Sequence, residues 1–279
     1  MIREFLNVFY GNELCLGIVF GAWFLGIATG AFAGAKIEHV FKHAFTVFVI
    51  TLMVMCFVLP VQIVFVRGIR GLLSVGVGEY ISLFPLLLTS FGLILPFSFI
   101  IGFIFPFSSK VILGATRDAA MDIGVVYIVE SMGSLFGGLV FSFFLVSRFH
   151  PFKIITLLNV GMFILLTFSL LLFSRKGQVS GGEESKKTKR VLGFIAAGMA
   201  LVMIVVWLSP IPDSAEALSA KMRWKISNPH IEMVASADSK YQHIDIGRQA
   251  EQYSIYLNGQ YASAFPNEYE YAQITHLVM

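Results

Sequence analysis

The sequence predicts a polytopic α-helical membrane bundle of about six spans, followed by a small, truncated antiparallel β domain. Three observations lead to this prediction. Hydrophobic residues make up 57% of the chain and charged residues only 13%, which is about half of the charge that a soluble domain usually carries. Six apolar stretches are long enough to cross about 30 Å of hydrocarbon as helices. After Pro210 the chain becomes polar and takes on the alternating pattern of strands.

The membrane domain is expected over residues 1–209, with an extramembrane segment over 210–279. Residues 1–12 resemble the tail of an earlier element, so we expect the N-terminus to be cut short. The linker 174–190 has the Gly, Ser and charge bias of a disordered loop. We expect the spans near 13–35, 44–66, 81–106, 123–146, 151–173 and 191–209.

Lysine and arginine in the short loops indicate the orientation. The linker holds six of them, and cytoplasmic loops carry the excess of positive charge. The loops on the linker's side contain Lys36, Lys42, Lys110 and Arg117, and the opposite loops contain Arg67, Arg70, Arg148 and Lys153. With six full spans, the bias predicts that the C-terminal segment lies outside. We expect a multi-pass protein of the cell (inner) membrane.

Small residues and prolines characterise the spans. Gly26, Gly30 and Gly34 recur every four residues, as do Gly17 with Gly21 and Gly133 with Gly137. This spacing places small residues on one helix face and predicts close helix packing. The third span contains Pro85, Pro96 and Pro106, which we expect to interrupt or kink it because each removes a backbone donor.

Glu130 is an ionisable residue well inside a span, about two turns or some 10 Å deep. Tyr127, one turn earlier, and Ser134, one turn later, could hydrogen-bond to it. Intramembrane carboxylates are costly and indicate function by default. Two interpretations stay open: a binding point for a cation or proton inside the bundle, and a hydrogen-bonded glutamate that locks two helices together.

The polar segment reads as strand, turn, strand, turn, strand over "KYQHIDIGRQAEQYSIYLNGQYASAF". Asn258-Gly259 is the favoured pair for a two-residue hairpin turn, because both residues adopt positive φ. After Pro266 we expect a helix with Asn267 as N-cap and Glu268 in its first turn. About forty residues of this kind bury little core, so we expect this β domain to be incomplete.

Residues 240–279 resemble the N-terminal β-hairpin domain of the spermidine synthases, the polyamine aminopropyltransferases. The run "YQHIDIGRQAEQYSIYLNGQYASAFPNEYEYAQITHLVM" is similar to the family's Y-Q-x-I, L-[ND]-G-x-x-Q-x-S and Y-x-E-x-x-x-H elements. The membrane half resembles the multi-spanning region fused to some bacterial members. The similar stretches are "GNELCLGIVFGAWFLGIATGAFAG", "GFIFPFSS" and "YIVESMGSLFGG".

The resemblance implies a membrane-anchored spermidine synthase-like protein of polyamine biosynthesis, in a transferase family. In that family a Rossmann-like domain follows the hairpin and binds the substrate decarboxylated S-adenosylmethionine at a Gly-rich loop. That domain is absent from this chain, so we expect a fragment or a protein inactive alone, with no catalytic residue and no cofactor of its own. Its partners would be the lipid bilayer and a C-terminal catalytic subunit or missing domain.

Three residues match substrate-groove positions of that family. Gln242 corresponds to the glutamine after the first tyrosine, Tyr271 to the aromatic residue at the groove rim, and His276 to the closing histidine. The chain departs from the pattern at Ala272 and Gln273, and Gln260 is the nearest counterpart of the glutamine after the hairpin. The alternatives are a sheet-edge side chain for Gln242, a packing residue for Tyr271 and a backbone hydrogen bond for His276.

Two other functions stay open: a polyamine or cation transporter around Glu130, and a non-catalytic membrane scaffold that pairs its hairpin edge with a soluble partner. A formal charge of +3 gives no indication of nucleic-acid binding. Cys15 and Cys56 lie in apolar runs without metal-ligand spacing, so we expect neither a metal site nor a disulfide framework. The oligomeric state is left open.

Overall fold

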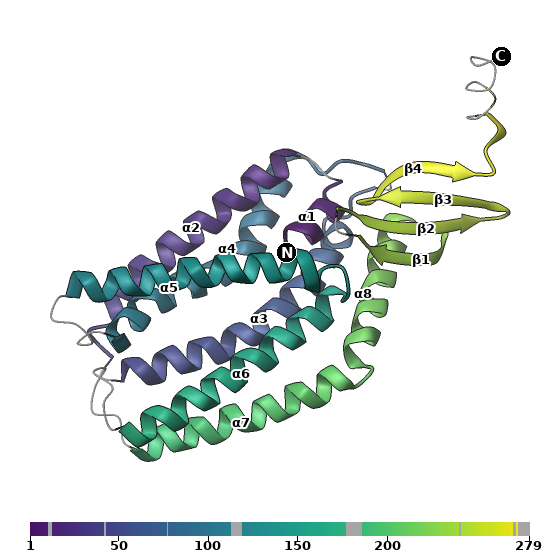
Figure 1. Ribbon diagram of the computed structural model, residues 1–279. Coiled ribbons are helices and arrows are strands. Elements are labelled where there is room, and N and C mark those ends of the chain that lie inside the picture. Colours follow the sequence, from purple (N-terminus) through teal and green to yellow (C-terminus); the bar gives the residue numbers. More distant parts are fainter. Residues whose placement is uncertain are drawn as a thin grey trace.

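The computed structural model of the protein describes residues 1–10, 13–41, 43–76, 78–112, 119–176, 186–239, 241–269 and 272. Six of its helices are long and apolar enough to cross a membrane, which confirms the predicted helical bundle. A short helix precedes them, and a further helix and a small sheet follow them (Figure 1). The first seven helices are α1 (Ile2–Val8), α2 (Glu13–Ile37), α3 (Ala44–Leu72), α4 (Leu83–Ile112), α5 (Ala119–Val140), α6 (Pro151–Lys176) and α7 (Lys186–Leu208).

Helices α2 and α4 pack backbone to backbone through glycine. A Cβ added to Gly30 would lie 2.1 Å from the carbonyl oxygen of Phe99, and one added to Gly102 would lie 2.1 Å from that of Ile27. The predicted glycine contact is therefore confirmed for Gly26, Gly30 and Gly34 of α2, whereas Gly17 and Gly21 of the same helix have nothing within 4 Å. A Cβ added to Gly133 of α5 would have nothing within 4 Å. The four-residue glycine spacing therefore makes no close helix contact there. Helix α4 continues as one helix through its prolines, and the expected interruption is not observed.

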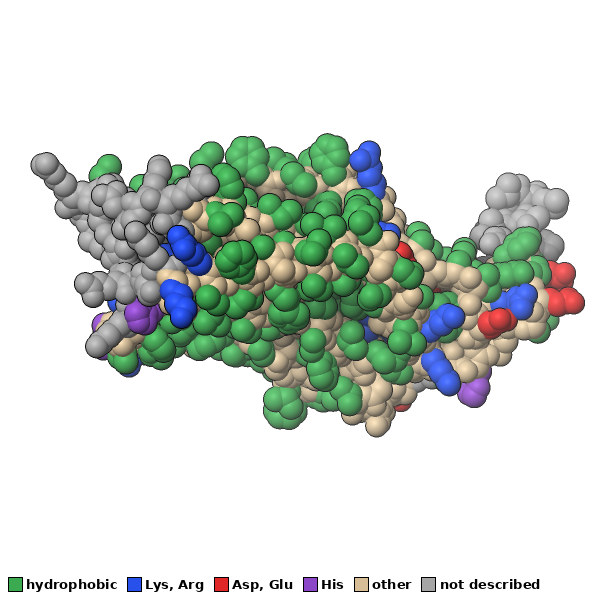
Figure 2. All heavy atoms as spheres, turned by 90° about the horizontal axis from the view of Figure 1, so that it is seen from below, with side chains coloured by type: hydrophobic (Ala, Val, Ile, Leu, Met, Phe, Trp, Pro, Cys, Tyr) green, Lys and Arg blue, Asp and Glu red, His purple; other side chains and the backbone are tan. Residues whose placement is uncertain are grey.

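The remaining spans differ in how deeply they are packed. Helices α3, α6 and α7 share a core that includes Phe45, Phe163 and Ala196. None of the residues in the most apolar part of α5 is buried; this helix continues into a π-helical turn, η1 (Phe141–Leu145). Hydrophobic side chains cover the helical part of the molecule, whereas charged side chains gather toward its ends (Figure 2). Such a surface suits hydrocarbon rather than water.

The segment after the last apolar helix begins with an unpredicted helix, α8 (Ile211–Ser227), which connects the bundle to the sheet (Figure 1). The sheet is antiparallel with the order β1-β2-β3-β4. The sequence predicted β2 to β4, and β1 is additional. Their bounds are β1 (Glu232–Asp238), β2 (His243–Gln249), β3 (Gln252–Leu257) and β4 (Gln260–Phe265).

The hairpin turn between β3 and β4 has the predicted conformation. Asn258 has a φ of 50° and Gly259 a φ of 80°, which is the pair of positive values that a two-residue turn of this kind needs. Beyond Pro266, Glu268 and Tyr269 are helical, where the sequence predicted a helix. The carboxyl end of that helix lies outside the described residues.

The positions of Arg67 and Arg70 correct the predicted end of the second span. The sequence placed both in a loop, but they lie inside the last turns of α3 and are buried. The helix can continue there because Glu4 and Glu216 neutralise Arg67. Backbone carbonyls of Val8, Gly76 and Glu79 accept hydrogen bonds from Arg70.

Candidate functional site

A guanidinium at the end of α3 joins three helices. Arg67 donates from Nε and Nη2 to the Glu4 carboxylate of α1, at 2.8 and 2.7 Å. Its Nη1 lies 2.7 Å from Ser219 Oγ and 2.7 Å from Glu216 Oε1, both on α8. The side chain of Arg67 is 0% exposed. Two parallel N–H···O bonds to one carboxylate fix geometry as well as charge, so this contact sets how α1 and α8 lie on the bundle.

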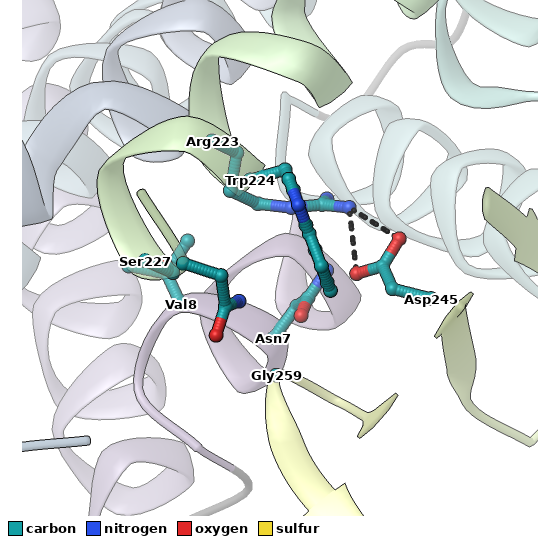
Figure 3. A pocket seen from close by; sticks show the side chains of 8 residues that line it. Asn7, Val8, Arg223, Trp224, Ser227, Asp245 and Gly259 are labelled. Carbon is teal, nitrogen blue, oxygen red and sulfur yellow. Dashed lines mark hydrogen bonds and ion pairs between the residues drawn. The ribbon is translucent and has the colours of Figure 1, made fainter. Parts of the chain in front are cut away.

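A second set of charges links α8 to the sheet. Arg223 Nη2 lies 3.3 Å from Asp245 Oδ2, and its Nη1 lies 3.8 Å from Glu4 Oε2. Figure 3 shows Arg223 and Asp245 facing each other beside the Trp224 ring. Because Arg223 faces both Asp245 and Glu4, the two sets of charges are continuous.

His243, the first residue of β2, closes the chain of contacts. Its Nδ1 lies 2.7 Å from Asp238 Oδ1 and its Nε2 lies 2.9 Å from Asp245 Oδ1, and Arg223 also contacts Nε2. Arg3 of α1 donates to Asp238 at 2.7 Å. We call these side chains the interface charge network; its members are Arg3, Glu4, Arg67, Glu216, Arg223, Asp238, His243 and Asp245.

The network favours the charged forms of Glu4, His243 and Asp245. Burial raises the pKa of Glu4, but hydrogen bonds and charge from Arg67 outweigh it and lower the pKa to about 2. Burial lowers the pKa of His243, but its hydrogen bonds to Asp238 and Asp245 outweigh this and the net pKa is raised. Burial raises the pKa of Asp245, and the hydrogen bond to His243 reverses this to a net lowering. An imidazolium between two carboxylates fits these directions.

The tip of the β3–β4 hairpin rests on the membrane domain. Asn258 Oδ1 accepts a hydrogen bond from the His243 N–H at 3.0 Å. A Cβ added to Gly259 would lie 2.6 Å from the Asn7 carbonyl oxygen and 3.1 Å from the Tyr10 ring. Figure 3 shows Gly259 next to Asn7. Only glycine fits both this approach and the positive φ.

The chemistry of the network is positioning rather than bond making. Its groups have opposite charges in contact, and these contacts orient the elements that carry them. Among the residues that the structure describes, there is no group of three or more His, Cys, Asp or Glu that could hold a metal ion. Trp224 adds an apolar contact to the junction, since its ring stacks edge-on against Tyr256 at 5.1 Å.

The residues proposed from sequence fall in two separate places. Gln242 lies in the β1–β2 turn, where its carbonyl accepts hydrogen bonds from the N–H and Oγ of Ser239 at 2.9 and 2.8 Å. Gln242 directly precedes His243 in the sequence, but it is not itself a member of the interface charge network. Tyr271 and His276 lie outside the described residues.

Glu130 and Tyr127 lie on α5, away from the sheet. Both are exposed on the surface of that helix, with Tyr127 65% exposed. The described part of the chain gives Glu130 no hydrogen bond or ion pair, so neither the expected bond to Tyr127 nor one to Ser134 is observed.

Sequence reasoning missed the network itself. Two arginines three residues apart at the end of an apolar span were the available signal, because charges at that depth need partners. The alternation of His243 and Asp245 in one strand was a second signal, since it places both on one sheet face. What the sequence did not show is that Glu4 and the α8 residues meet them.

Comparisons with protein-family models, with curated proteins and with solved structures found no match to this chain. Its function therefore has to be inferred from its own residues and their geometry.

Proposed function

We propose that this chain is a membrane-anchored spermidine synthase-like protein of polyamine biosynthesis in the cell membrane. Its bundle would hold a synthase-type β domain at the membrane surface. The transfer itself, with decarboxylated S-adenosylmethionine as substrate, would be carried out by a catalytic domain on a longer chain or a separate subunit. The observation that carries the proposal is the apolar outer face of the sheet.

The inner face of this sheet carries buried charges beside the apolar Tyr256 and Ala264, and the outer face carries apolar side chains beside the Arg248–Glu232 ion pair. The inner face, toward α8, presents the buried His243 and Asp245. The outer face presents Ile246, whose cross-strand partner is Ile255, and Tyr253, whose partner is Phe265. An antiparallel sheet with one face in water normally turns its polar residues outward.

Exposed apolar area on the outer face predicts a covering domain. Ile255 is 37% exposed, Tyr253 41% and Phe265 68%, and together they form one patch rather than scattered residues. Contiguous apolar patches of this kind mark interaction sites. In the resemblance, the catalytic domain that follows the hairpin is the element that would pack there.

The junction with the membrane would keep the β domain in a fixed place. The interface charge network and the hairpin tip on α1 tie the sheet to three helices. Charge-assisted hydrogen bonds add geometric specificity, so the contacts of Asp238 with Arg3 and of Asp245 with Arg223 favour one position of the sheet on α1 and α8. A docked sheet can present one face to a partner reproducibly.

The first test reads the coding DNA beyond the Met279 codon, for about six hundred bases, which is the length of an ordinary domain. A Gly-rich strand-to-helix loop that continues in frame, or after one frameshift, would support the proposal. A stop codon with no such loop nearby would overturn the version with a longer chain.

The second test measures aminopropyl transfer from labelled decarboxylated S-adenosylmethionine to putrescine in membranes that contain the chain and its catalytic partner. We expect Ile255→Glu to reduce membrane-bound activity, because it places a charge in the contact. The matched control is Leu218→Glu on α8, which is 73% exposed and lies off the sheet. Equal activity in both variants, or no transfer in the membranes, would contradict the proposal.

Sidedness gives an independent test. Decarboxylated S-adenosylmethionine is a cytosolic metabolite in this family, whereas the loop charges predict that the sheet lies outside. Both native cysteines are buried, so Glu251→Cys in the β2–β3 turn would be the readily labelled thiol. Protection from an impermeant maleimide in intact cells supports the enzyme, and labelling contradicts it.

The transporter alternative has no comparable support. Glu130 is exposed on α5 and lines none of the described cavities. The scaffold alternative predicts that the membranes show no transfer in the second test.

A further inference from the structure

Two cavities meet where the bundle joins the sheet. The first, which we call the lateral cavity, has a volume of about 510 Å³. It lies among α1, α2, α3, α4, η1 and α6, and its walls are mainly apolar. Its apolar walls include Trp23, Ile63, Phe97, Ile155 and Leu158.

The second cavity, which we call the vestibule, has a volume of about 610 Å³ and lies between the η1–α6 loop, α8 and β1. Charges of both signs line it. The basic side chains are Arg148, His150, Lys221 and His243, and the acidic ones are Asp213, Glu216 and Asp238.

The two cavities adjoin because they share wall residues. Val146, Phe149, Asp238 and His243 line both. Arg3 and Glu4 also line the lateral cavity, so its polar residues gather at the end that adjoins the vestibule. An apolar space in the membrane domain therefore leads into a charged space at the surface.

We propose that the lateral cavity and the vestibule form one binding site for a membrane phospholipid with a zwitterionic, primary-ammonium headgroup. One acyl chain occupies the lateral cavity and the headgroup lies in the vestibule. This goes beyond the proposed transferase, and it holds whether or not a catalytic domain packs on the sheet.

The tail assignment follows from size and polarity. Small-molecule sites usually enclose about 300–1,000 Å³, so the lateral cavity can hold one chain. Water is a poor occupant among Phe97, Ile155 and Leu158, because it needs two to four polar partners. An empty space would deprive these side chains of dispersion contacts, and hydrocarbon is the solvent at hand.

The headgroup assignment follows from charge. Asp213, which is 53% exposed in its side chain, and Asp238 at the junction can accept from an ammonium group. Arg148 and Lys221 can bind a phosphate. Asp213 already pairs with His150 and Lys153 at 2.8 and 3.3 Å, and Asp238 pairs with Arg3 at 2.7 Å. A headgroup of one charge would compete with these pairs, whereas a zwitterionic headgroup can contact side chains of both signs. Primary ammonium carries the N–H donors that carboxylates need.

The experiment uses the full chain in phosphatidylcholine vesicles that contain a phosphatidylethanolamine with a diazirine near the end of one acyl chain. After illumination, labelled peptides are identified by mass spectrometry. We expect saturable labelling of the cavity walls on α3 and α6. Phosphatidylethanolamine should compete with the probe about tenfold better than phosphatidylglycerol, because a hydrogen bond to a charged group has about that effect.

Two variants on α6 separate the cavity from the general lipid-facing surface. Leu158→Trp fills the lateral cavity, and Leu158 is 52% exposed, so the core is not overpacked. Leu165→Trp is the matched control, two turns away and 66% exposed. We expect Leu158→Trp to abolish saturable labelling and Leu165→Trp to retain it, with the same circular dichroism for both.

Three outcomes would overturn the proposal. Equal labelling in the two tryptophan variants would show that the cavity holds no lipid chain. Labelling that never saturates would show contact with bulk lipid only. Better competition by phosphatidylglycerol would assign the headgroup to an anionic lipid. Transferase activity is not read in this experiment, so its result is independent of the enzyme.

Discussion

Replacing Arg67 by methionine removes the guanidinium that joins α1 to α8 while keeping most of the side-chain volume. Glu4 on α1 and Glu216 on α8 would then both lack the guanidinium that they contact. We expect the free energy of unfolding to fall by about 3 kcal/mol or more, because removing one member of a buried ion pair leaves a charge without compensation.

The magnitude can be worked from Glu4. Its pKa falls from 4.5 to about 2 in the folded protein, and each pKa unit corresponds to about 1.4 kcal/mol, which gives about 3 kcal/mol. Because the folded pKa is lowered, this stabilisation is fully present above pH 4.5 and is lost as the pH falls toward about 2. Arg67→Met should therefore also flatten the acid side of the stability curve.

The assay is equilibrium unfolding in detergent micelles, followed by tryptophan fluorescence, with Glu4→Gln and the double variant completing a mutant cycle. The control is Arg148→Met, an exposed arginine for which we expect a change within about 0.5 kcal/mol. A loss below about 1 kcal/mol for Arg67→Met, or strict additivity in the cycle, would refute the reasoning.

Three further predictions concern packing, pH and the hairpin. Gly30→Leu should destabilise the bundle by roughly 2 kcal/mol or more, because its Cβ would overlap Phe99 of α4. Gly17→Leu is the control and should not destabilise the bundle, because Gly17 has open space around it. Thermal unfolding of both variants tests this difference. The raised pKa of His243 contributes stability that is fully present below pH 6.5 and is lost as the pH rises through the folded value. The melting temperature of the protein should therefore fall between about pH 6 and pH 9, and His243→Gln should abolish that fall. Gly259→Ala should cost about 1–2 kcal/mol, because alanine resists positive φ; proteolysis of the hairpin should become faster, and unchanged rates would contradict the packing on α1.

The membrane spans were predictable because hydrocarbon imposes a simple demand. Backbone polar groups in lipid have to be satisfied within the segment, so a long apolar run such as 151–173 can only be a helix. The Asn258-Gly259 turn was predictable for a similar local reason, since its backbone conformation is encoded in two residues. Both predictions are confirmed.

The interface charge network was not predictable in this way. Glu4 and Arg67 are 63 residues apart, and Arg67 and Ser219 are 152 apart, so no local pattern pairs them. The expected span 44–66 ended before Arg67, so the sequence placed Arg67 in a loop together with Arg70. Only the docking of α1 and α8 supplies the carboxylates that let the helix bury it.

The sequence by itself determined which segments cross the membrane and where the hairpin turns, because those choices depend on solvent and on local backbone conformation. The tertiary structure decided which face of the sheet is apolar and outward, how the lateral cavity meets the vestibule, and that Glu130 lies on an exposed helix face. These features depend on which distant side chains come within about 4 Å of one another, the range over which contacts and ion pairs act.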